Sequence, residues 1–555
     1  MPSVQDPPAV LDQLIQDYFE TDHEYFPTQA TALGLPGHDH RLEILSEERI
    51  QELVGKLKGF QRRLESIAAE SLPLPQEVEH RYLRSLLSAA LRDFEKEKNH
   101  RKDPCLYPDA AFHSLLSLIL WKSEPRDVML ENVASRLRQF PLLLDSGIRQ
   151  LQNPPPLFTS QAAESIRQGE VIFDEMIPQL LETASPGLRK LVLDSVAEGK
   201  EAMLRYLEFV EKELAPRSSG DYAVGKEAFD ERLRNNHFLT VDAQELLETG
   251  KEIFAKYEVQ MNALARELGE NRWLSVILAN KKNHPEAANL IQTYSREVAD
   301  ARAFVLQKNL VSIPVPETVE VIETPAFHRL ITPLAAFLPP GPFQKAQKGF
   351  FLVTPVDNQA PMEAQAAHLL EHNIHKIRLN SVHEAYPGHH LQFVFCSTLD
   401  SDLRKRARNT LYVEGWAIYC ETLMGELGYF NEPVSQLFLM KDQIWRAARV
   451  ILDVGLQTGT LSYDDAVSWL HDKIGFGVPS ARAEVNRYCR MPTQPLSYTI
   501  GKMEIEKLRD DYRKARGPDF SLKEFHDSFL ACGAVPIALA RTLMLGNHKR
   551  EGSHS

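Results

Sequence analysis

The chain has 555 residues, 43% of them hydrophobic and 25% charged, which is typical of a globular protein with a large buried core. Its formal net charge of −13 at pH 7 argues against general nucleic-acid binding, because a phosphate backbone binds to a basic surface. No apolar run approaches the ~20 residues that span a bilayer, so no membrane span is predicted.

Cysteine usage and the first residues of the chain bear on the cellular compartment. The five cysteines are scattered without CxxC spacing, and such a sparse, odd set suits a reducing compartment better than a disulfide framework. The start, MPSVQDPPAV, has neither a basic segment nor an apolar h-region, so no signal peptide is visible. We therefore predict a cytoplasmic protein.

The first half of the chain, up to about residue 309, has a helical pattern, because apolar residues recur at three- and four-residue spacing. Asp242 is expected to be the N-cap of one of these helices. We predict helices at 47–69, 77–98, 128–151, 186–214 and 243–269. Residues 1–230 are expected to form a helical wall of a cleft and 231–555 a catalytic helical region, the two joined in one continuous structural unit.

The character of the sequence changes between residues 311 and 356, where prolines accumulate. Two short segments, Thr318–Glu323 and Gly349–Thr354, favour β structure, and proline restricts such strands to edges or strand ends. We predict a small sheet or hairpin just before the metal site, with short strands within about 316–355. An exposed strand there would suit an extended peptide by strand addition; the alternative is a proline-rich clip between two helical halves.

The second half of the chain returns to a helical pattern from Met362 onward. We predict helices at 363–385, 389–399, 401–428, 432–458, 462–473, 480–490, 497–516 and 521–531. The overall prediction is a mainly α-helical fold with a small β element near the active site.

The stretch HEAYPGHHLQF, residues 383–393, carries the strongest chemical signal. In the usual HExxH helix two histidines one turn apart bind zinc, but here the +4 position is Pro387. His389 and His390 lie at +6 and +7, about 9 and 10.5 Å further along a regular helix than His383. Pro387-Gly388 therefore predicts a kink that returns one of the two histidines to the ion. Spacing does not decide between His389 and His390.

A third ligand is expected from VEGWAIYCE, residues 413–421, on a separate helix. A catalytic zinc site needs three protein ligands and an open position for water. Glu414 is the first candidate. Glu421, two turns further on, is the competing candidate and is expected instead to orient a ligand histidine.

These motifs carry a family resemblance. VEGWAIYCE resembles the NEGFASYxE stretch of gluzincin aminopeptidases, and GHHLQF resembles part of the zinc helix of angiotensin-converting enzyme and its helical relatives. More closely, HEAYPGHHLQF, YVEGWAIY and QPLSYTIG resemble the bacterial family called domain of unknown function 885, which is grouped with zinc metallopeptidases. The resemblance runs through most of the chain and is strongest over 383–501.

The resemblance implies a gluzincin-like helical fold with a deep cleft and one Zn²⁺ ion. It makes His383, Glu414 and one of His389 and His390 the ligands, and Glu384 the base that activates water. Adjacency supports this role independently, since on a helix Glu384 is offset by about 100° from His383.

Substrate groups are expected further along the chain. Tyr498 in QPLSYTIG is predicted to stabilise the oxyanion, with Gly501 allowing close approach. Arg449, Arg487 and Tyr488 are candidates to bind a substrate carboxylate, the alternative for the two arginines being salt bridges on helix faces. One departure from the family is Gln457, where relatives often have a histidine.

The predicted function is zinc-dependent hydrolysis of amide bonds, with small peptides as substrates. One alternative is a metal-dependent hydrolase of a non-peptide amide or lactam. A second is a catalytically silent, metal-binding helical scaffold. The sequence gives no prediction of the oligomeric state.

Overall fold

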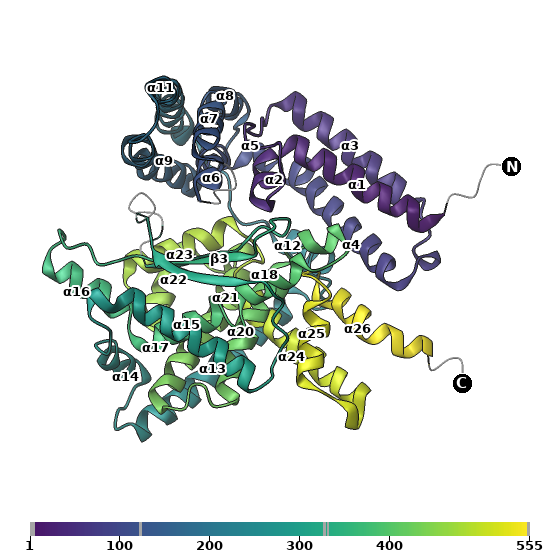
Figure 1. The fold of residues 1–555 in the computed structure, drawn as a ribbon, viewed down its shortest axis with the longest axis vertical. Helices are drawn as coiled ribbons and strands as arrows, with labels where there is room; N and C mark the ends of the chain where they lie inside the picture. The colour runs from purple at the N-terminus through teal and green to yellow at the C-terminus, as the bar shows by residue number, and fades with distance from the viewer. Residues whose placement is uncertain (1–5, 121–124, 326–328, 330–331, 333, 552–555) are drawn as a thin grey trace. The chain divides into compact units, whose positions relative to one another are not determined.

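The computed structural model describes residues 6–120, 125–325, 329, 332 and 334–551 (Figure 1). The described chain is mainly α-helical with one small three-stranded sheet, which confirms the predicted fold class. The chain divides into two compact units. The first comprises Met1–Tyr222, Ala326–Leu330 and Phe343–Lys345, and the second comprises Ala223–Pro325, Ile331–Pro342 and Ala346–Ser555. The gluzincin-like detail, the deep cleft and its predicted wall stay predictions.

The first unit is built from helices with short 3₁₀ and π segments between them. Its elements are α1 (Pro7–Tyr25), α2 (Pro27–Leu33), α3 (Glu47–Glu65), η1 (Ala69–Ser71), α4 (Leu74–Leu91), η2 (Arg92–Glu97), α5 (Asn99–Lys102), α6 (Leu106–Leu120), α7 (Arg126–Leu137), α8 (Phe140–Gln150), α9 (Pro156–Val171), η3 (Ile172–Met176), α10 (Ile177–Leu180), α11 (Pro186–Glu208), η4 (Phe209–Leu214) and η5 (Ala215–Arg217).

The first unit has its own apolar core, to which α6, α7, α8 and α11 contribute. The buried guanidinium of Arg136 lies in this unit and donates to the Ser117 hydroxyl at 3.0 Å and to the Thr31 hydroxyl at 2.6 Å. These bonds satisfy a charged group that burial would otherwise destabilise.

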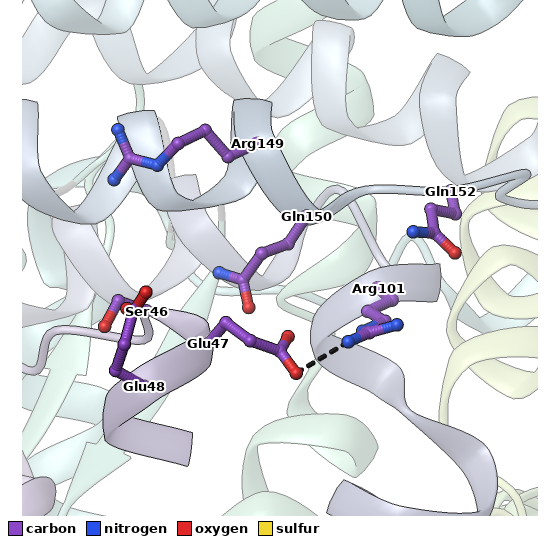
Figure 2. Close-up of a pocket in the computed structure, with 7 residues that line it drawn as sticks. All are labelled: Ser46, Glu47, Glu48, Arg101, Arg149, Gln150 and Gln152. Carbon is purple, nitrogen blue, oxygen red and sulfur yellow. Dashed lines mark hydrogen bonds and ion pairs between the residues drawn. The ribbon is translucent and has the colours of Figure 1, made fainter. Parts of the chain in front are cut away.

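A polar hollow of about 260 Å³ opens in the first unit. Arg101 Nη2 donates to Glu47 Oε1 at 2.6 Å, and Gln150 Nε2 donates to the Leu45 carbonyl oxygen at 2.6 Å. Figure 2 shows that the Arg149 side chain points away from this ion pair. The ion pair links α3 to α5 across the hollow. The complete lining is Ser46, Glu47, Glu48, Arg101, Arg149, Gln150 and Gln152.

The second unit contains the sheet and the remaining helices. Its helices are α12 (Lys226–Asn235), α13 (Ala243–Glu267), α14 (Trp273–Asn280), η6 (Ala287–Asn289), α15 (Leu290–Gln307), α16 (Met362–Glu371), α17 (Ile374–Glu384), α18 (His389–Ser397), α19 (Asp402–Arg406), α20 (Thr410–Glu426), α21 (Pro433–Gln457), α22 (Tyr463–Trp469), η8 (Leu470–Ile474), α23 (Val478–Arg490), α24 (Ser497–Arg516), η9 (Gly517–Asp519), α25 (Leu522–Leu530) and α26 (Ile537–Glu551).

The sheet of the second unit has the strand order β1-β3-β2, with β1 at Thr318–Glu323, β2 at Ala335–Leu338 and β3 at Lys348–Val353. The predicted small sheet is confirmed, and its first strand has the predicted bounds. The hairpin alternative is wrong for these two strands, because β1 runs parallel to β3, with Thr318 opposite Lys348. The antiparallel partner of β3 is β2. Peptide binding by strand addition stays a prediction.

Local sequence signals explain where the helices begin and end. Asp242 caps α13 as predicted, because its side chain accepts from Glu245 N while Glu245 reaches back to Asp242 N in a capping box. Three predicted helices, at 128–151, 363–385 and 401–428, are each divided into two helices in the structure. Pro141 lies in the first turn of α8, while Asn373 and Asn409 accept from the first-turn N–H groups of α17 and α20.

None of the helices in the described part of the chain combines the length and the apolar character that a membrane-spanning segment requires. This finding agrees with the prediction, made from the sequence, that these residues contain no membrane span.

Candidate metal centre

The predicted kink in HEAYPGHHLQF is a complete break between two helices. α17 ends at Glu384, and α18 begins at His389. Gly388 donates its N–H to the Val382 carbonyl oxygen at 3.1 Å, and a Cβ atom at Gly388 would lie 1.9 Å from the His383 carbonyl oxygen. Only glycine therefore fits where the chain turns back on the end of α17.

A helix further along the chain, α20, holds this break in place. The Pro387 carbonyl oxygen accepts the indole N–H of Trp416 at 2.8 Å and the thiol of Cys420 at 3.6 Å. Both donors belong to α20, which also carries Glu414. The connection between α17 and α18 is therefore fixed to the helix that supplies the third predicted ligand.

The side chains of His383, Glu384 and His389 converge at this break. Each offers a donor atom, and these atoms all lie within 4.8 Å of one another. Glu414 Oε2 lies 3.9 Å from His383 Nε2 and 3.5 Å from His389 Nε2. The two histidines are buried, whereas Glu384 and Glu414 are partly exposed. The structure thus brings together two imidazoles and two carboxylates in a position that solvent reaches.

His390 points to a different set of partners. Its Nε2 lies 2.7 Å from Glu317 Oε2, and the same buried carboxylate accepts the hydroxyl of Tyr386 and pairs with Arg302 at 3.1 Å. Between the two histidines that the sequence left open, the structure places His389 beside Glu414 and His390 beside Glu317.

Glu421 orients His383 from the side opposite Glu414. Glu421 Oε1 lies 2.7 Å from His383 Nδ1, and only 1% of the Glu421 side chain is exposed. Arg446 Nη2 lies 3.6 Å from the same oxygen. With Nδ1–H donated to Glu421, the lone pair of His383 Nε2 faces Glu414, which is the arrangement that a carboxylate behind a ligand histidine produces.

The charges of the cluster shift the pKa values of its members. Burial alone would lower the pKa of His389, but its hydrogen bond to the Glu414 carboxylate and the charges of Glu414 and Glu384 raise it to about 9. Burial favours the neutral form of Glu414, yet His389, His383 and Arg449 lower its pKa to about 2. The cluster therefore holds a carboxylate that needs a neighbouring positive charge.

The donor set fits a zinc ion. The Nδ1 atoms of His383 and His389 face the acceptor oxygens of Glu421 and Gln392, at 2.7 and 3.5 Å. Their Nε2 lone pairs then point at the Glu414 carboxylate, and lone pairs facing a carboxylate repel one another unless a proton or a metal cation lies between them. Two imidazoles and one carboxylate are a common ligand set of catalytic zinc. His383, His389 and Glu414 are the residues that would hold it.

The predicted carboxylate binders contact a protein carboxylate, which is the salt-bridge alternative for the two arginines; their binding of a substrate stays a prediction. Arg449 Nη2 and Arg487 Nη2 each lie 3.1 Å from Glu484 Oε2, and the Tyr488 hydroxyl donates to the same oxygen at 2.6 Å. Arg449 Nε also contacts the Tyr488 hydroxyl at 3.1 Å. Glu484 lies one turn before Arg487 and Tyr488 on α23, so this helix supplies an anion to all three predicted side chains.

Tyr498 lies in the first turn of α24, at a close crossing with α20. A Cβ atom on Gly501 would lie 2.0 Å from the Leu411 carbonyl oxygen, so the two backbones are in contact there. The guanidinium of Arg449 lies 4.5 Å from the centre of the Tyr498 ring, and that of Arg446 lies 5.8 Å from it. Tyr498 is half-buried. Its ring lies near the guanidinium of Arg446, the same arginine that lies beside Glu421.

Gln457 has a structural role. It is fully buried, and its Nε2 donates to the carbonyl oxygens of Tyr488 and Cys489 at 2.8 and 3.1 Å. Its Oε1 accepts from Val224 N at 3.3 Å. Gln457 therefore fastens the end of α23, and its side-chain amide is engaged there and not in the cluster of His383 and His389.

Sequence reasoning missed three charged residues that contact the predicted site residues. Glu317 precedes β1 by one residue, Arg446 lies on α21, and Glu484 lies on α23. Arg446 and Arg449 follow one another at three-residue spacing in RAAR, which places them on one face of α21 and was the one available signal. Glu317 and Glu484 have no motif of their own.

Comparison with solved structures shows the fold. The chain is similar to a protein from Shewanella oneidensis called a "putative lipoprotein of unknown function", with a TM-score of 0.80, 23% identity, and coverage of 98% of this chain and 100% of that one. It is also similar to a "putative lipoprotein" from Colwellia psychrerythraea, with a TM-score of 0.82, 18% identity, and coverage of 97% and 99%. No curated protein matches.

The names of these two proteins contradict the predicted cytoplasmic location, and that prediction was wrong. It rested on the start of the sequence and on five sparse cysteines, which the structure shows to be buried and not linked in disulfides. Buried thiols that pack as small apolar groups carry little information on the compartment, because they neither require nor prevent an oxidising one.

The similarity extends to a family defined by sequence. The family described as "Bacterial protein of unknown function (DUF885)" matches residues 27–544, which is nearly the whole chain. The motifs around His383 and Glu414 that carried the resemblance lie inside this match, and the chain therefore belongs to the DUF885 family.

Proposed function

We propose that this protein is a zinc-dependent hydrolase of amide bonds, with small peptides as its substrate class. The observation that carries the proposal is the convergence of the donor atoms of His383, His389 and Glu414 beside the carboxylate of Glu384. Three protein ligands of this kind leave a coordination position for water, as catalytic zinc sites require. The resemblance of HEAYPGHHLQF and YVEGWAIY to zinc metallopeptidase motifs points to the same chemistry.

Glu384 would carry the proton transfers of the reaction. A bound zinc ion supplies Lewis-acid polarisation of the substrate carbonyl and lowers the pKa of a coordinated water. The Glu384 carboxylate is partly exposed at the last residue of α17, one position after His383. It would accept the proton of the attacking water and then donate it to the leaving amine nitrogen.

Other side chains would orient the ligand His383 and stabilise the charge that develops on the substrate carbonyl oxygen. Glu421 fixes the ring of His383 through the 2.7 Å contact at Nδ1, and Arg446 lies beside that carboxylate. The hydroxyl of Tyr498 would donate to the carbonyl oxygen as negative charge develops on it. The Arg449 guanidinium over the Tyr498 ring adds positive potential at this position and limits the freedom of the ring.

Metal content tests the ligand set. Elemental analysis of the purified full chain, dialysed against a slight excess of zinc and then against metal-free buffer, should give bound zinc for the wild type and a clear loss for Glu414→Ala. Glu426→Ala is the matched control, because Glu426 lies on the same helix with 53% of its side chain exposed. A wild-type chain that retains no zinc would refute every metal-dependent reading of the site.

A peptide-library digest followed by mass spectrometry tests the reaction. Zinc-loaded wild type should cleave short peptides, and Glu384→Gln should keep zinc but lose turnover by a factor of 10² or more. If Glu384→Gln cleaves at the wild-type rate, Glu384 is not the base. If zinc-loaded wild type cleaves no peptide, the peptidase proposal fails, and a screen of non-peptide amides and lactams then separates another hydrolase from a silent scaffold.

A further inference from the structure

Two histidines outside the candidate metal centre face each other at the end of α16. His368 lies in the last turn of α16 and His372, four positions further on, is its C-cap residue, so the two side chains lie on the same side of the helix end. Their Nε2 atoms are 3.1 Å apart, and their rings are tilted by 42° with centroids 4.7 Å apart. This is the i, i+4 arrangement in which two helical histidines converge on one metal ion.

A third donor atom comes from the end of the sheet. The carbonyl oxygen of Thr354, which directly follows β3, lies 3.1 Å from His368 Nε2. Ligands bound to one ion at about 2.0–2.2 Å are separated from each other by roughly 3 Å, so both separations suit a shared ion. His372 is 1% exposed and His368 is half-buried, which leaves one side of the group open to solvent.

Hydrogen bonds alone do not satisfy this group well. A neutral imidazole carries a single N–H. If His368 Nε2 carries it, that hydrogen faces two acceptors, His372 Nε2 and the Thr354 oxygen. If His372 Nε2 carries it, the lone pair of His368 Nε2 faces the lone pairs of the Thr354 oxygen at 3.1 Å. A cation would accept the lone pairs of all three atoms at once.

The surroundings resemble the support that metal ligands usually have. His372 Nδ1 lies 3.1 Å from the hydroxyl of the buried Tyr294, which is also hydrogen-bonded by Asn380. Donation of Nδ1–H to Tyr294 leaves the Nε2 lone pair of His372 free for a metal. His372 also caps the C-terminus of α16, the end of a helix that favours a positive charge. Glu371 pairs with Lys281 at 2.5 Å and is not a ligand.

We propose that His368, His372 and the carbonyl oxygen of Thr354 bind a second divalent transition-metal ion, of the class that prefers imidazole nitrogen, such as Zn²⁺ or Ni²⁺. Water completes its coordination from the open side. The ion would clip the end of α16 to the end of β3. It is independent of the proposed hydrolase activity, because it shares no ligand with the centre at His383.

Counting bound metal per chain tests the proposal. Equilibrium dialysis of the full chain against Ni²⁺, with elemental analysis, should give two equivalents for the wild type, one for His368→Gln, one for His383→Ala, and none for the double variant. His471→Gln, a change at an exposed histidine on η8, is the control and should bind two. If His368→Gln binds as much Ni²⁺ as the wild type, the second site does not exist. If His383→Ala binds as much as the wild type, the first site fails instead.

Tyr294→Phe gives a second test that leaves both histidines in place. Loss of the hydroxyl should weaken Ni²⁺ binding at the second site by about 10- to 100-fold and leave the first site unchanged. The measurement is a Ni²⁺ titration in the His383→Ala background with and without Tyr294→Phe. Equal affinities in the two proteins would contradict the assigned role of His372.

Discussion

Gly415 of α20 meets Gly501 of α24 with no side chain between their backbones. A Cβ atom on Gly415 would lie 2.5 Å from the carbonyl carbon of Gly501, and one on Gly501 would lie 2.8 Å from the Cα atom of Gly415. The ligand candidate Glu414 directly precedes one glycine, and Tyr498 lies one turn before the other. The crossing therefore sets the separation between two groups that the proposed reaction needs.

Gly501→Ala should separate these helices and lower the free energy of unfolding by about 2–4 kcal/mol, because the added methyl group meets backbone atoms that cannot rotate away. Gly55→Ala is the control, since a Cβ atom on Gly55 of α3 meets nothing within 4 Å. It should stabilise the chain by about 0.5–1 kcal/mol through helix propensity. Urea unfolding followed by circular dichroism measures both, and equal effects of the two substitutions would contradict the crossing.

Glu421→Gln should weaken zinc binding by about 10- to 100-fold without abolishing it. The amide keeps the shape of the side chain but loses the charge that holds His383 through Nδ1. Competition with a chromophoric zinc chelator gives the affinity. Glu426→Gln, an exposed change on the same helix, should leave the affinity unchanged. Wild-type affinity in Glu421→Gln would show that His383 is oriented by other groups.

His389→Ala and His390→Gln should have opposite signatures. Loss of His389 removes a donor within the cluster and should abolish zinc binding at the centre of His383 and Glu414, while the chain keeps its fold. Loss of His390 breaks a buried contact to Glu317 and should cost about 1–3 kcal/mol of stability, with zinc still bound. Zinc content and urea midpoints of the two variants show which of the two histidines binds the ion and which stabilises the fold. Zinc retained by His389→Ala but lost by His390→Gln would reverse the ligand assignment.

His526 should make the stability of the chain fall as the pH is lowered from 6.5 to 4. Burial lowers the pKa of His526 to about 4; the Leu310 carbonyl and Asp527 oppose this effect, and Arg509 adds to it. Between these pH values the unfolded chain binds a proton that the native chain does not, so stability rises with pH in this window. The full change for this group is about 3 kcal/mol.

Comparison of variants isolates the contribution of His526. Its ring accepts the Tyr419 hydroxyl at 2.8 Å and donates to the Leu310 carbonyl oxygen at 2.7 Å, so His526→Gln keeps some hydrogen bonding without a titrating group. Urea midpoints measured at several pH values should depend less on pH in His526→Gln than in the wild type. The exposed change His471→Gln should keep the wild-type slope. An unchanged slope in His526→Gln would exclude His526 as the source.

The features that the sequence predicted correctly are those with local causes. The strand Thr318–Glu323 is rich in β-branched residues, and Asp242 with Glu245 forms a capping box within four residues. The break after Glu384 follows from Pro387 and Gly388, whose backbone preferences act within one turn. Each of these signals is contained in a few neighbouring residues, so tertiary structure confirmed them without being needed to find them.

The features that the sequence did not predict depend on distant partners. The different positions of His389 and His390 depend on Glu317, which contacts His390 and lies 73 residues before it. The role of Arg449 depends on Glu484, 35 residues further along the chain. Carboxylates are common on helix surfaces, and spacing alone does not indicate which of them the fold will bury against a given cation. The location was mispredicted for a related reason, since cysteine content reports on it only indirectly.

The hydrogen bonds from α20 to the Pro387 carbonyl oxygen have a consequence for protein engineering. The eleven residues from His383 to Phe393 do not form a metal site by themselves. Trp416 and Cys420 fasten the turn between His383 and His389, and Glu421 fixes the ring of His383. Grafting this segment alone onto another helical scaffold should not transfer metal binding. The smallest transplantable part is the pair of segments together, with α20 packed across the turn.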